Sequence, residues 1–117
     1  MAFAFAHEHP CLTRVLKEAY VFTTPWQHAR GLYARKKKPA LFVFKRPTRS
    51  AFHSMFFTHD FGMISLDANG MIGEVHVLKP WRVWTPREAY HAMLEIPLVG
   101  DWKKTWEQLI ACLEEEQ

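Results

Sequence analysis

Apolar and polar residues follow one another through the middle of the chain in a pattern typical of β-strands. Apolar side chains recur at alternate positions or in short runs, and each segment is bounded by proline, glycine or a polar turn. We expect strands at residues 40–44, 51–58, 63–67, 71–78 and 89–96. Between the third and fourth, Asp67-Ala68-Asn69-Gly70 predicts a tight turn, because Asn and Gly adopt positive φ at little cost. These two strands should form a hairpin.

Two other segments show the spacing of helices. Thr24 is a good N-cap and Pro25 suits the first helical position, so a short helix is predicted over residues 25–32. A second, amphipathic helix is predicted over residues 101–116. Its apolar stripe should pack against the sheet, and it consists of Trp102, Trp106, Leu109, Ile110 and Leu113.

Two segments are less regular. Residues 15–23 interleave Val, Tyr and Phe with Lys and Glu, a pattern that fits a strand or a helix. We expect a strand there, because a helix start follows immediately. Residues 80–88 are expected to form a long loop that contains Trp81 and Trp84.

The elements together predict a single domain over residues 1–117. We expect a mainly β fold, an antiparallel β-sandwich or partly open barrel, with a short helix after the first strand and a C-terminal amphipathic helix. The composition agrees, since 49% of the residues are hydrophobic and 15% are aromatic. That is enough apolar material for one core without metal or disulfide support.

The charge is unevenly distributed, although the net charge is only +3. Residues 19–59 contain no Asp or Glu, and they carry Arg30, Arg35, Lys36, Lys37, Lys38, Lys45, Arg46 and Arg49. A face of this kind attracts anions, so an anionic small molecule or an acidic partner is expected, or else a merely solubilising surface. Nucleic acid is a weaker hypothesis. The aromatic residues near this stretch, Phe42, Phe44, Phe52, Phe56 and Phe57, are needed to fill the core.

The cysteines and the apolar runs bear on the cellular compartment. Cys11 and Cys112 have no metal-site spacing and can pair only if the two chain ends meet, so free buried thiols and a cytoplasmic protein are expected. No apolar run approaches the roughly 20 residues that cross a bilayer, so no membrane association is expected. The opening MAFAFA lacks the basic region of a secretory signal.

Two groups of residues could carry catalytic or metal chemistry. His7 and His9 would face the same side of an extended chain, but a metal site needs a further ligand, and none is expected. His53, His59, Asp60 and His76 flank neighbouring strands and could supply general acid–base catalysis if they converged. Separate surface positions are the more common outcome for histidines on strands. No nucleophile or phosphate-binding motif is present, and no cofactor is expected.

Arginine and tryptophan side chains are the candidates for ligand binding. Arg30 and Arg35 could clamp a carboxylate or phosphate, or could pin the first helix to the sheet through Asp67 or Glu95. Trp81 and Trp84 lie beside Arg82 in a loop. Large aromatic residues in a loop mark either a ligand groove or protein contact, or a lid folded back on the core. We take Arg30, Arg35, Trp81, Arg82 and Trp84 as the candidate ligand-binding residues.

Several of these motifs occur together in a known family. TPWQHARGL at residues 24–32 followed by Arg35, the ALFVF strand, the segment 53–67 with its Asp-Ala-Asn-Gly turn, and MLEIP at residues 93–97 resemble the domain of unknown function 192 over residues 15–97. The resemblance implies a small, mostly antiparallel β fold and no particular reaction. In two places the chain departs from the family pattern. Gly62 occupies the family's acidic position, with Asp60 two residues earlier, and a Trp-rich helix replaces the family's glycine-containing end.

The leading functional hypothesis is a binding module for an anionic ligand, in which the basic face and the Trp-containing loop form the site. A small hydrolase or isomerase that uses the four-residue His/Asp cluster is the first alternative. The second is a protein-interaction module that docks through its C-terminal helix. The expected assembly state is a monomer or a weak homodimer.

Overall fold

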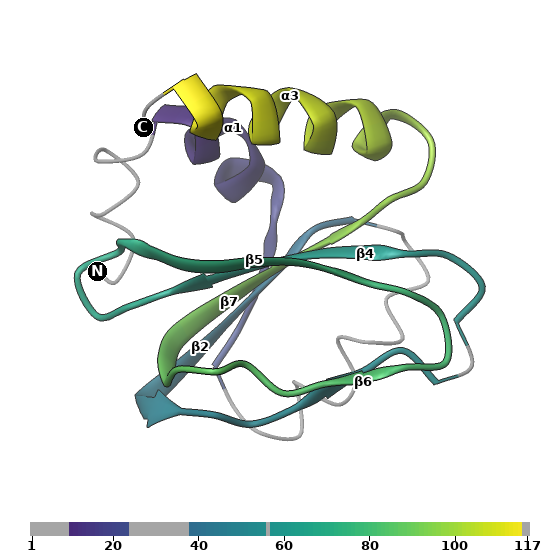
Figure 1. Ribbon diagram of the computed structural model, residues 1–117. Coiled ribbons are helices and arrows are strands. Elements are labelled where there is room, and N and C mark those ends of the chain that lie inside the picture. Colours follow the sequence, from purple (N-terminus) through teal and green to yellow (C-terminus); the bar gives the residue numbers. More distant parts are fainter. Residues whose placement is uncertain (1–9, 24–37, 56, 116–117) are drawn as a thin grey trace.

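The computed structural model of the protein describes residues 10–23, 38–55 and 57–115. Two helices lie on one face of a five-stranded sheet, and a two-stranded sheet lies below its other face (Figure 1). The helices are α1 (Pro10–Glu18) and α3 (Asp101–Glu115). The strands are β1 (Tyr20–Phe22), β2 (Ala40–Thr48), β3 (Phe52–His53), β4 (Phe61–Leu66), β5 (Ile72–Leu78), β6 (Val83–Trp84) and β7 (Tyr90–Pro97).

The larger sheet is open and mostly antiparallel. Its strand order is β1-β2-β7-β4-β5, and only β1 and β2 pair in parallel. Strands β3 and β6 form the smaller sheet. Among the described strands β1 and β5 remain as edges, so these strands do not close into a barrel. The predicted mainly β class and the C-terminal helix are confirmed.

The predicted hairpin is formed by β4 and β5. The Asp67 carboxylate oxygen Oδ1 accepts hydrogen bonds from the backbone N–H groups of Asn69 at 2.8 Å and Met71 at 2.9 Å. Gly70 follows with φ of 82°, a conformation that glycine adopts without a Cβ penalty. The turn therefore closes for the reason that the Asp-Ala-Asn-Gly sequence predicted.

Each face of the large sheet covers its own core. The face toward the helices buries Leu12, Val15, Leu41, Ile64, Leu66, Ala92, Leu94, Ile96, Trp106 and Leu109. The opposite face, toward the small sheet, buries Ala40, Phe42, Phe52, Phe61, Met63, Leu78, Tyr90 and Met93. Every residue of β4 is buried, and so is every residue of β7 except His91, because both faces of these central strands are covered.

The beginning of the described chain differs from the prediction. Residues 15–23 were expected to be a strand, but α1 extends to Glu18 and β1 covers only three residues. Leu12 and Val15 are three residues apart, so both point to one side of a helix, where they are buried against α3 and the sheet. The helix predicted over residues 25–32 lies outside the described residues.

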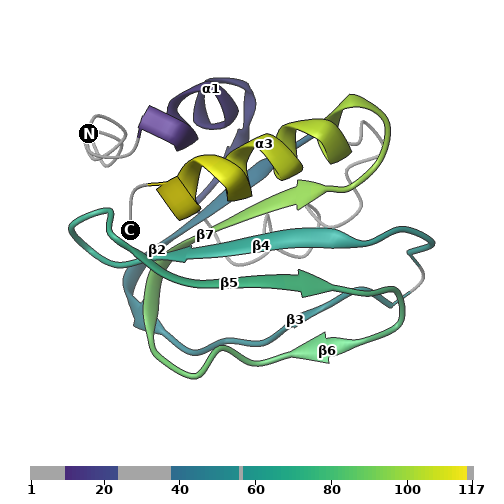
Figure 2. The same cartoon turned by 45° about the horizontal axis from the view of Figure 1, so that its top comes forward.

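The expectation of free cysteine thiols was wrong. Cys11 on α1 and Cys112 on α3 form a disulfide, with their Cα atoms 5.9 Å apart. The pairing is possible because α1 packs beside α3 and so brings the two cysteines together (Figure 2). Disulfides are typical of oxidising compartments, so the cysteines no longer support a cytoplasmic location, which stays a prediction. Within the described residues, no helix is long and apolar enough to span a membrane.

The segments around β3 and β6 are less regular than predicted. Strand β3 has only two residues where residues 51–58 were expected to be extended, and β4 already begins at Phe61. The loop over residues 80–88 contains the short strand β6, which pairs Trp84 with Phe52 and Val83 with His53. Two residues on each side are enough to form the small sheet below the large one.

Helix α3 packs closely on the sheet where the indole of Trp106 contacts Gly62. A Cβ atom at Gly62 of β4 would lie 2.4 Å from Cε3 and Cζ3 of Trp106, far inside contact distance. Trp106 is itself only 7% exposed. The absence of a side chain at position 62 therefore leaves the space that the indole of Trp106 fills.

We predict that the disulfide contributes strongly to stability. It closes a loop with a sequence separation of 101 residues, and the chain-entropy treatment gives about 5 kcal/mol for a loop of that order. A Cys11→Ser/Cys112→Ser protein should unfold at a clearly lower urea concentration than the oxidised wild type, and reduced wild type should match it. Coincident unfolding midpoints for all three would contradict the prediction.

We also predict steric coupling between Gly62 and Trp106. Gly62→Ala should cost roughly 1–3 kcal/mol by overpacking, and Trp106→Ala roughly 3–5 kcal/mol by leaving a cavity. The double variant should be less destabilised than the sum of the two, since the smaller side chain makes room for the new methyl group. Urea unfolding of the four proteins measures this difference. Replacing Trp102 instead of Trp106 is the control, for which additive effects are expected.

Candidate ligand-binding turn

The turn between β5 and β6 presents large side chains to solvent. It connects the large sheet to the small one at one end of the molecule (Figure 2). The side chains of Trp81 and Val83 are 50% and 64% exposed, and Arg82 is also exposed. The Lys79 side chain is 71% exposed. Here one short segment of chain carries an aromatic ring and two cations at its surface.

A buried serine fixes the shape of this turn. Ser54, which has no exposed surface, donates its hydroxyl to the carbonyl oxygen of Lys79 and accepts from the N–H of Arg82 at 3.0 Å. Its backbone N–H donates to the Arg82 carbonyl at 2.9 Å, and its own carbonyl accepts from the Trp81 N–H at 3.1 Å. Four hydrogen bonds from a single buried residue hold residues 79–82 in one conformation.

The backbone of Trp81 is strained. Its φ is 59°, and among the described residues it is the only residue other than glycine with a positive φ. For a residue with a side chain this region costs roughly 1–2 kcal/mol. Strain of this kind persists where the surroundings impose it, and it concentrates at functional sites. The hydrogen bonds of Ser54 provide that constraint here.

The two cations lie on either side of the exposed indole in the sequence. Arg82 donates from Nη1 to the carbonyl oxygen of Trp81 at 3.2 Å, which holds the guanidinium beside the turn. Lys79 Nζ lies 3.6 Å from Oδ2 of Asp60. An ion pair this exposed contributes little, so the lysine can exchange this partner for a ligand.

Trp84 has a different environment from Trp81. Its ring stacks on His76 of β5, with the ring centroids 4.5 Å apart and the planes at 9°, and it packs against the core between the two sheets. Burial lowers the pKa of His76, and nearby Glu74 opposes that change. The Glu74 carboxylate also accepts the backbone N–H groups of Arg87 and Glu88 at 3.2 and 3.1 Å. Trp84 therefore covers the core, and Trp81 is the exposed aromatic residue of the pair.

The residues proposed for acid–base catalysis engage separate partners. Nδ1 of His53 accepts a hydrogen bond from the backbone two residues on, and His59 packs against two phenylalanine rings. Asp60 faces Lys79, whereas His76 stacks on the tryptophan described above. In the part of the chain that the structure describes, no three His, Cys, Asp or Glu side chains are arranged to hold a metal ion. His7, His9, Arg30 and Arg35 lie outside the described residues.

Glu95 is a buried acid that the sequence suggested only as a possible partner of an arginine. It lies on β7 between Ala40 of β2 and Met63 of β4, and it is 4% exposed. Burial raises the pKa of its carboxyl group to about 8. The signal in the sequence was a single acid inside the apolar run AMLEIP, whose neighbours on both sides are core residues.

Comparison with known proteins identifies the family. The family model of the domain of unknown function 192 (DUF192), described as uncharacterized ACR, matches residues 12–104. The chain belongs to the DUF192 family. It is 32% identical over 74 residues to the UPF0127 protein PH1112 of Pyrococcus horikoshii, a match that covers 61% of this chain and 64% of the relative. The match thus spans slightly less than two thirds of the relative's length.

Solved structures show the same fold at lower sequence identity. A candidate transcription regulator from Sinorhizobium meliloti 1021 superposes with a TM-score of 0.61 at 19% identity, covering 74% of this DUF192 chain and 71% of that protein. A protein of unknown function from Novosphingobium aromaticivorans gives a TM-score of 0.59 at 16% identity, with 75% and 67% covered. The similarity supports the architecture alone.

We predict that Glu95 makes the protein less stable as the pH rises. Burial raises its pKa from the ordinary value of 4.5 to about 8 in the folded protein, so the folded state binds the proton more tightly. The contribution of Glu95 to the free energy of unfolding is therefore fully present below pH 4.5 and is lost as the pH rises to about 8, by an amount on the order of 5 kcal/mol. Glu95→Gln should lack this loss. The free energy of unfolding of the variant, measured in urea, should therefore increase relative to that of wild type between pH 5 and pH 8.5.

His76 serves as an internal control in that experiment. Its pKa is lowered in the folded state, so its contribution to stability rises with pH and is the same in both proteins. A difference between Glu95→Gln and wild type that does not change with pH would contradict the prediction.

Proposed function

We propose that the chain is a binding module for an anionic ligand that also carries a ring or another apolar part. The indole of Trp81 would contact the apolar part, and Arg82 and Lys79 would bind the negative charge. The observation that carries the proposal is the half-exposed indole at positive φ on a turn fixed by buried Ser54.

Preorganisation is the physical reason for favouring this turn. A ligand that binds a fixed surface does not have to order it first, so more of the contact energy appears as affinity. An exposed tryptophan next to an arginine supplies apolar contact together with charged hydrogen bonds to a carboxylate or phosphate. The overall charge supports an anion, since the calculated pI is about 9.0. Arg30 and Arg35 remain further candidates for the same ligand.

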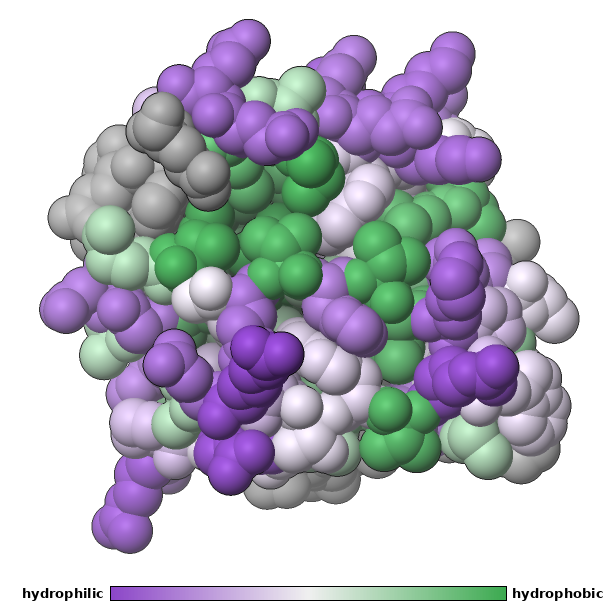
Figure 3. All heavy atoms as spheres, viewed as in Figure 1, coloured by the Kyte–Doolittle hydropathy of each residue, from purple (hydrophilic) through white to green (hydrophobic). Residues whose placement is uncertain are grey.

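The alternatives find less support. Acid–base catalysis needs convergent groups, and His53, His59, Asp60 and His76 contact different partners. Docking through α3 needs a free apolar stripe, but Trp106 and Leu109 are buried against the sheet. Figure 3 shows hydrophilic side chains along the outer side of this helix, at the top of the view. Nucleic-acid binding needs exposed aromatic platforms, whereas Phe42 and Phe52 are buried.

We predict that removing either chemical component of the turn weakens binding. Phenyl phosphate and a heparin fragment serve as probes in titration calorimetry at low salt. Trp81→Ala and Arg82→Glu should each reduce the affinity for phenyl phosphate about tenfold, equivalent to about 1.4 kcal/mol. Heparin binding should depend mainly on Arg82 and should weaken as the salt concentration rises.

The control is Lys103→Glu, which makes the same change in charge at an exposed position on α3. It should leave phenyl phosphate binding unchanged. Equal losses for Arg82→Glu and Lys103→Glu would show only a general effect of net charge, and such a result would exclude a site at the turn. If neither phenyl phosphate nor heparin bound to the wild-type protein, a site at the turn would also be excluded.

A further inference from the structure

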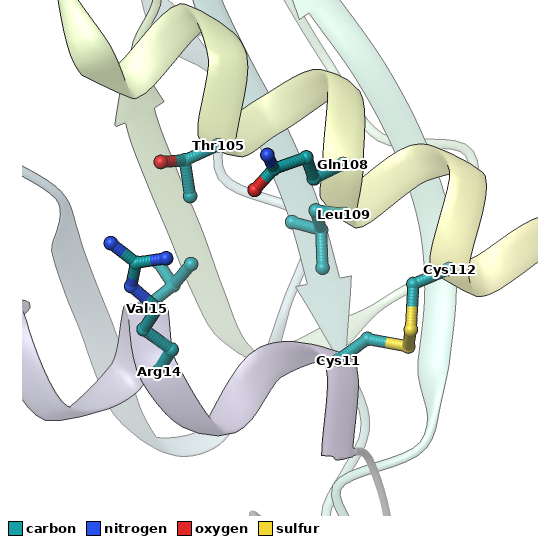
Figure 4. A pocket seen from close by; sticks show the side chains of 7 residues that line it. All are labelled: Cys11, Arg14, Val15, Thr105, Gln108, Leu109 and Cys112. Atoms are coloured by element: carbon teal, nitrogen blue, oxygen red, sulfur yellow. A yellow bond between two sulfur atoms is a disulfide. The ribbon is translucent and has the colours of Figure 1, made fainter.

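A second candidate site lies on the helical side of the molecule. A hollow of about 190 Å³ opens between α1 and α3 (Figure 4). It is lined by Cys11, Arg14, Val15, Thr105, Gln108, Leu109 and Cys112. The disulfide therefore forms part of a cavity wall.

The lining has three parts, which are the disulfide at one end, apolar side chains beside it and polar side chains toward the other end. Figure 4 shows the sulfur–sulfur bond at one end of the hollow, with Leu109 beside it. Arg14, Thr105 and Gln108 border the other end, and all three carry hydrogen-bonding groups. A guanidinium, a hydroxyl and an amide around one opening suit a carboxylate.

The spacing along the helices sets the size of the molecule that would fit. Cys11 and Arg14 are three residues apart on α1, which is a rise of about 4.5 Å along a helix axis. On α3, Cys112 and Gln108 are four residues apart, about 6 Å along the axis. The hollow therefore extends over about one turn of each helix, and with its volume of about 190 Å³ it suits a small molecule.

We propose that this hollow is a thiol–disulfide exchange site for a small thiol that bears a carboxylate. The carboxylate binds Arg14, and the thiolate attacks one sulfur of the Cys11–Cys112 bond. A bond forms between the incoming sulfur and that cysteine, and the other cysteine leaves as a thiolate. A second thiol then completes the reaction, so two thiols are oxidised to one disulfide while the protein disulfide is reduced to two thiols.

Arg14 assists because its positive charge increases the local concentration of anionic thiols at the hollow. The consequence for the fold is specific, because reduction removes the disulfide that cross-links α1 to α3. The two helices would then be joined by packing alone.

The test uses the folded, oxidised protein and three thiols that differ in charge. These are 3-mercaptopropionate, neutral 2-mercaptoethanol and cationic 2-aminoethanethiol, with rates corrected for the fraction of thiolate. Free thiols are trapped by alkylation and counted by mass. At low salt the anionic thiol should react at least about tenfold faster than the cationic one, which is the lower end of electrostatic steering.

Arg14→Glu should reverse this preference, and Arg14→Gln should abolish it. Lys103→Glu, which lies on α3 outside the lining of the hollow, should retain the wild-type ratio. The proposal is wrong if the three thiols react equally with wild type, or if Arg14→Glu and Lys103→Glu behave alike. It is also wrong if the reduction rate does not depend on thiol concentration, because the bond would then open only after unfolding.

Discussion

The contact between Trp106 and Gly62 determines how the helical layer sits on the sheet. β4 pairs with both β5 and β7, so Gly62 lies in the interior of the large sheet, and no side chain stands between its backbone and the indole. With the ring in that space, α3 comes close enough to bury Leu109 and to bring Cys112 to Cys11. A side chain at position 62 would occupy the space of the indole, so the glycine is a condition for this packing of the helix.

Elements that depend on local signals were predictable from the sequence. The hairpin follows from Asp67 and Gly70, the end of β7 from Pro97, and α3 from the helical spacing of its apolar residues. Helix α1 was not predictable in the same way. Its segment fits two periodicities, and the contact that decides between them comes from α3, about a hundred residues later. The disulfide depends on the same contact, which is why sequence separation alone argued against it.

The candidate site depends on contacts between residues that are distant in the sequence, and the sequence alone did not predict these contacts. The aromatic loop was recognisable, but Trp81 and Trp84 were equivalent in the sequence. They differ because Ser54, far away along the chain, fixes the turn at Trp81, while His76 stacks on Trp84. The histidines do not converge for the same reason. They lie on or beside neighbouring predicted strands, but each contacts a different partner in the folded protein. The two proposed sites are a surface turn and the hollow between the helices, while the interior of the sheet is filled by packed side chains.

The most direct test of the Trp106–Gly62 contact is a nuclear Overhauser measurement on the folded, oxidised protein. We expect strong cross-peaks between the Gly62 α proton that points toward the indole and the Hε3 and Hζ3 protons of Trp106. We also expect this α proton to be shifted upfield, because it lies over the face of the ring. A folded protein with a helical α3 that shows neither the cross-peaks nor the shift would contradict the contact.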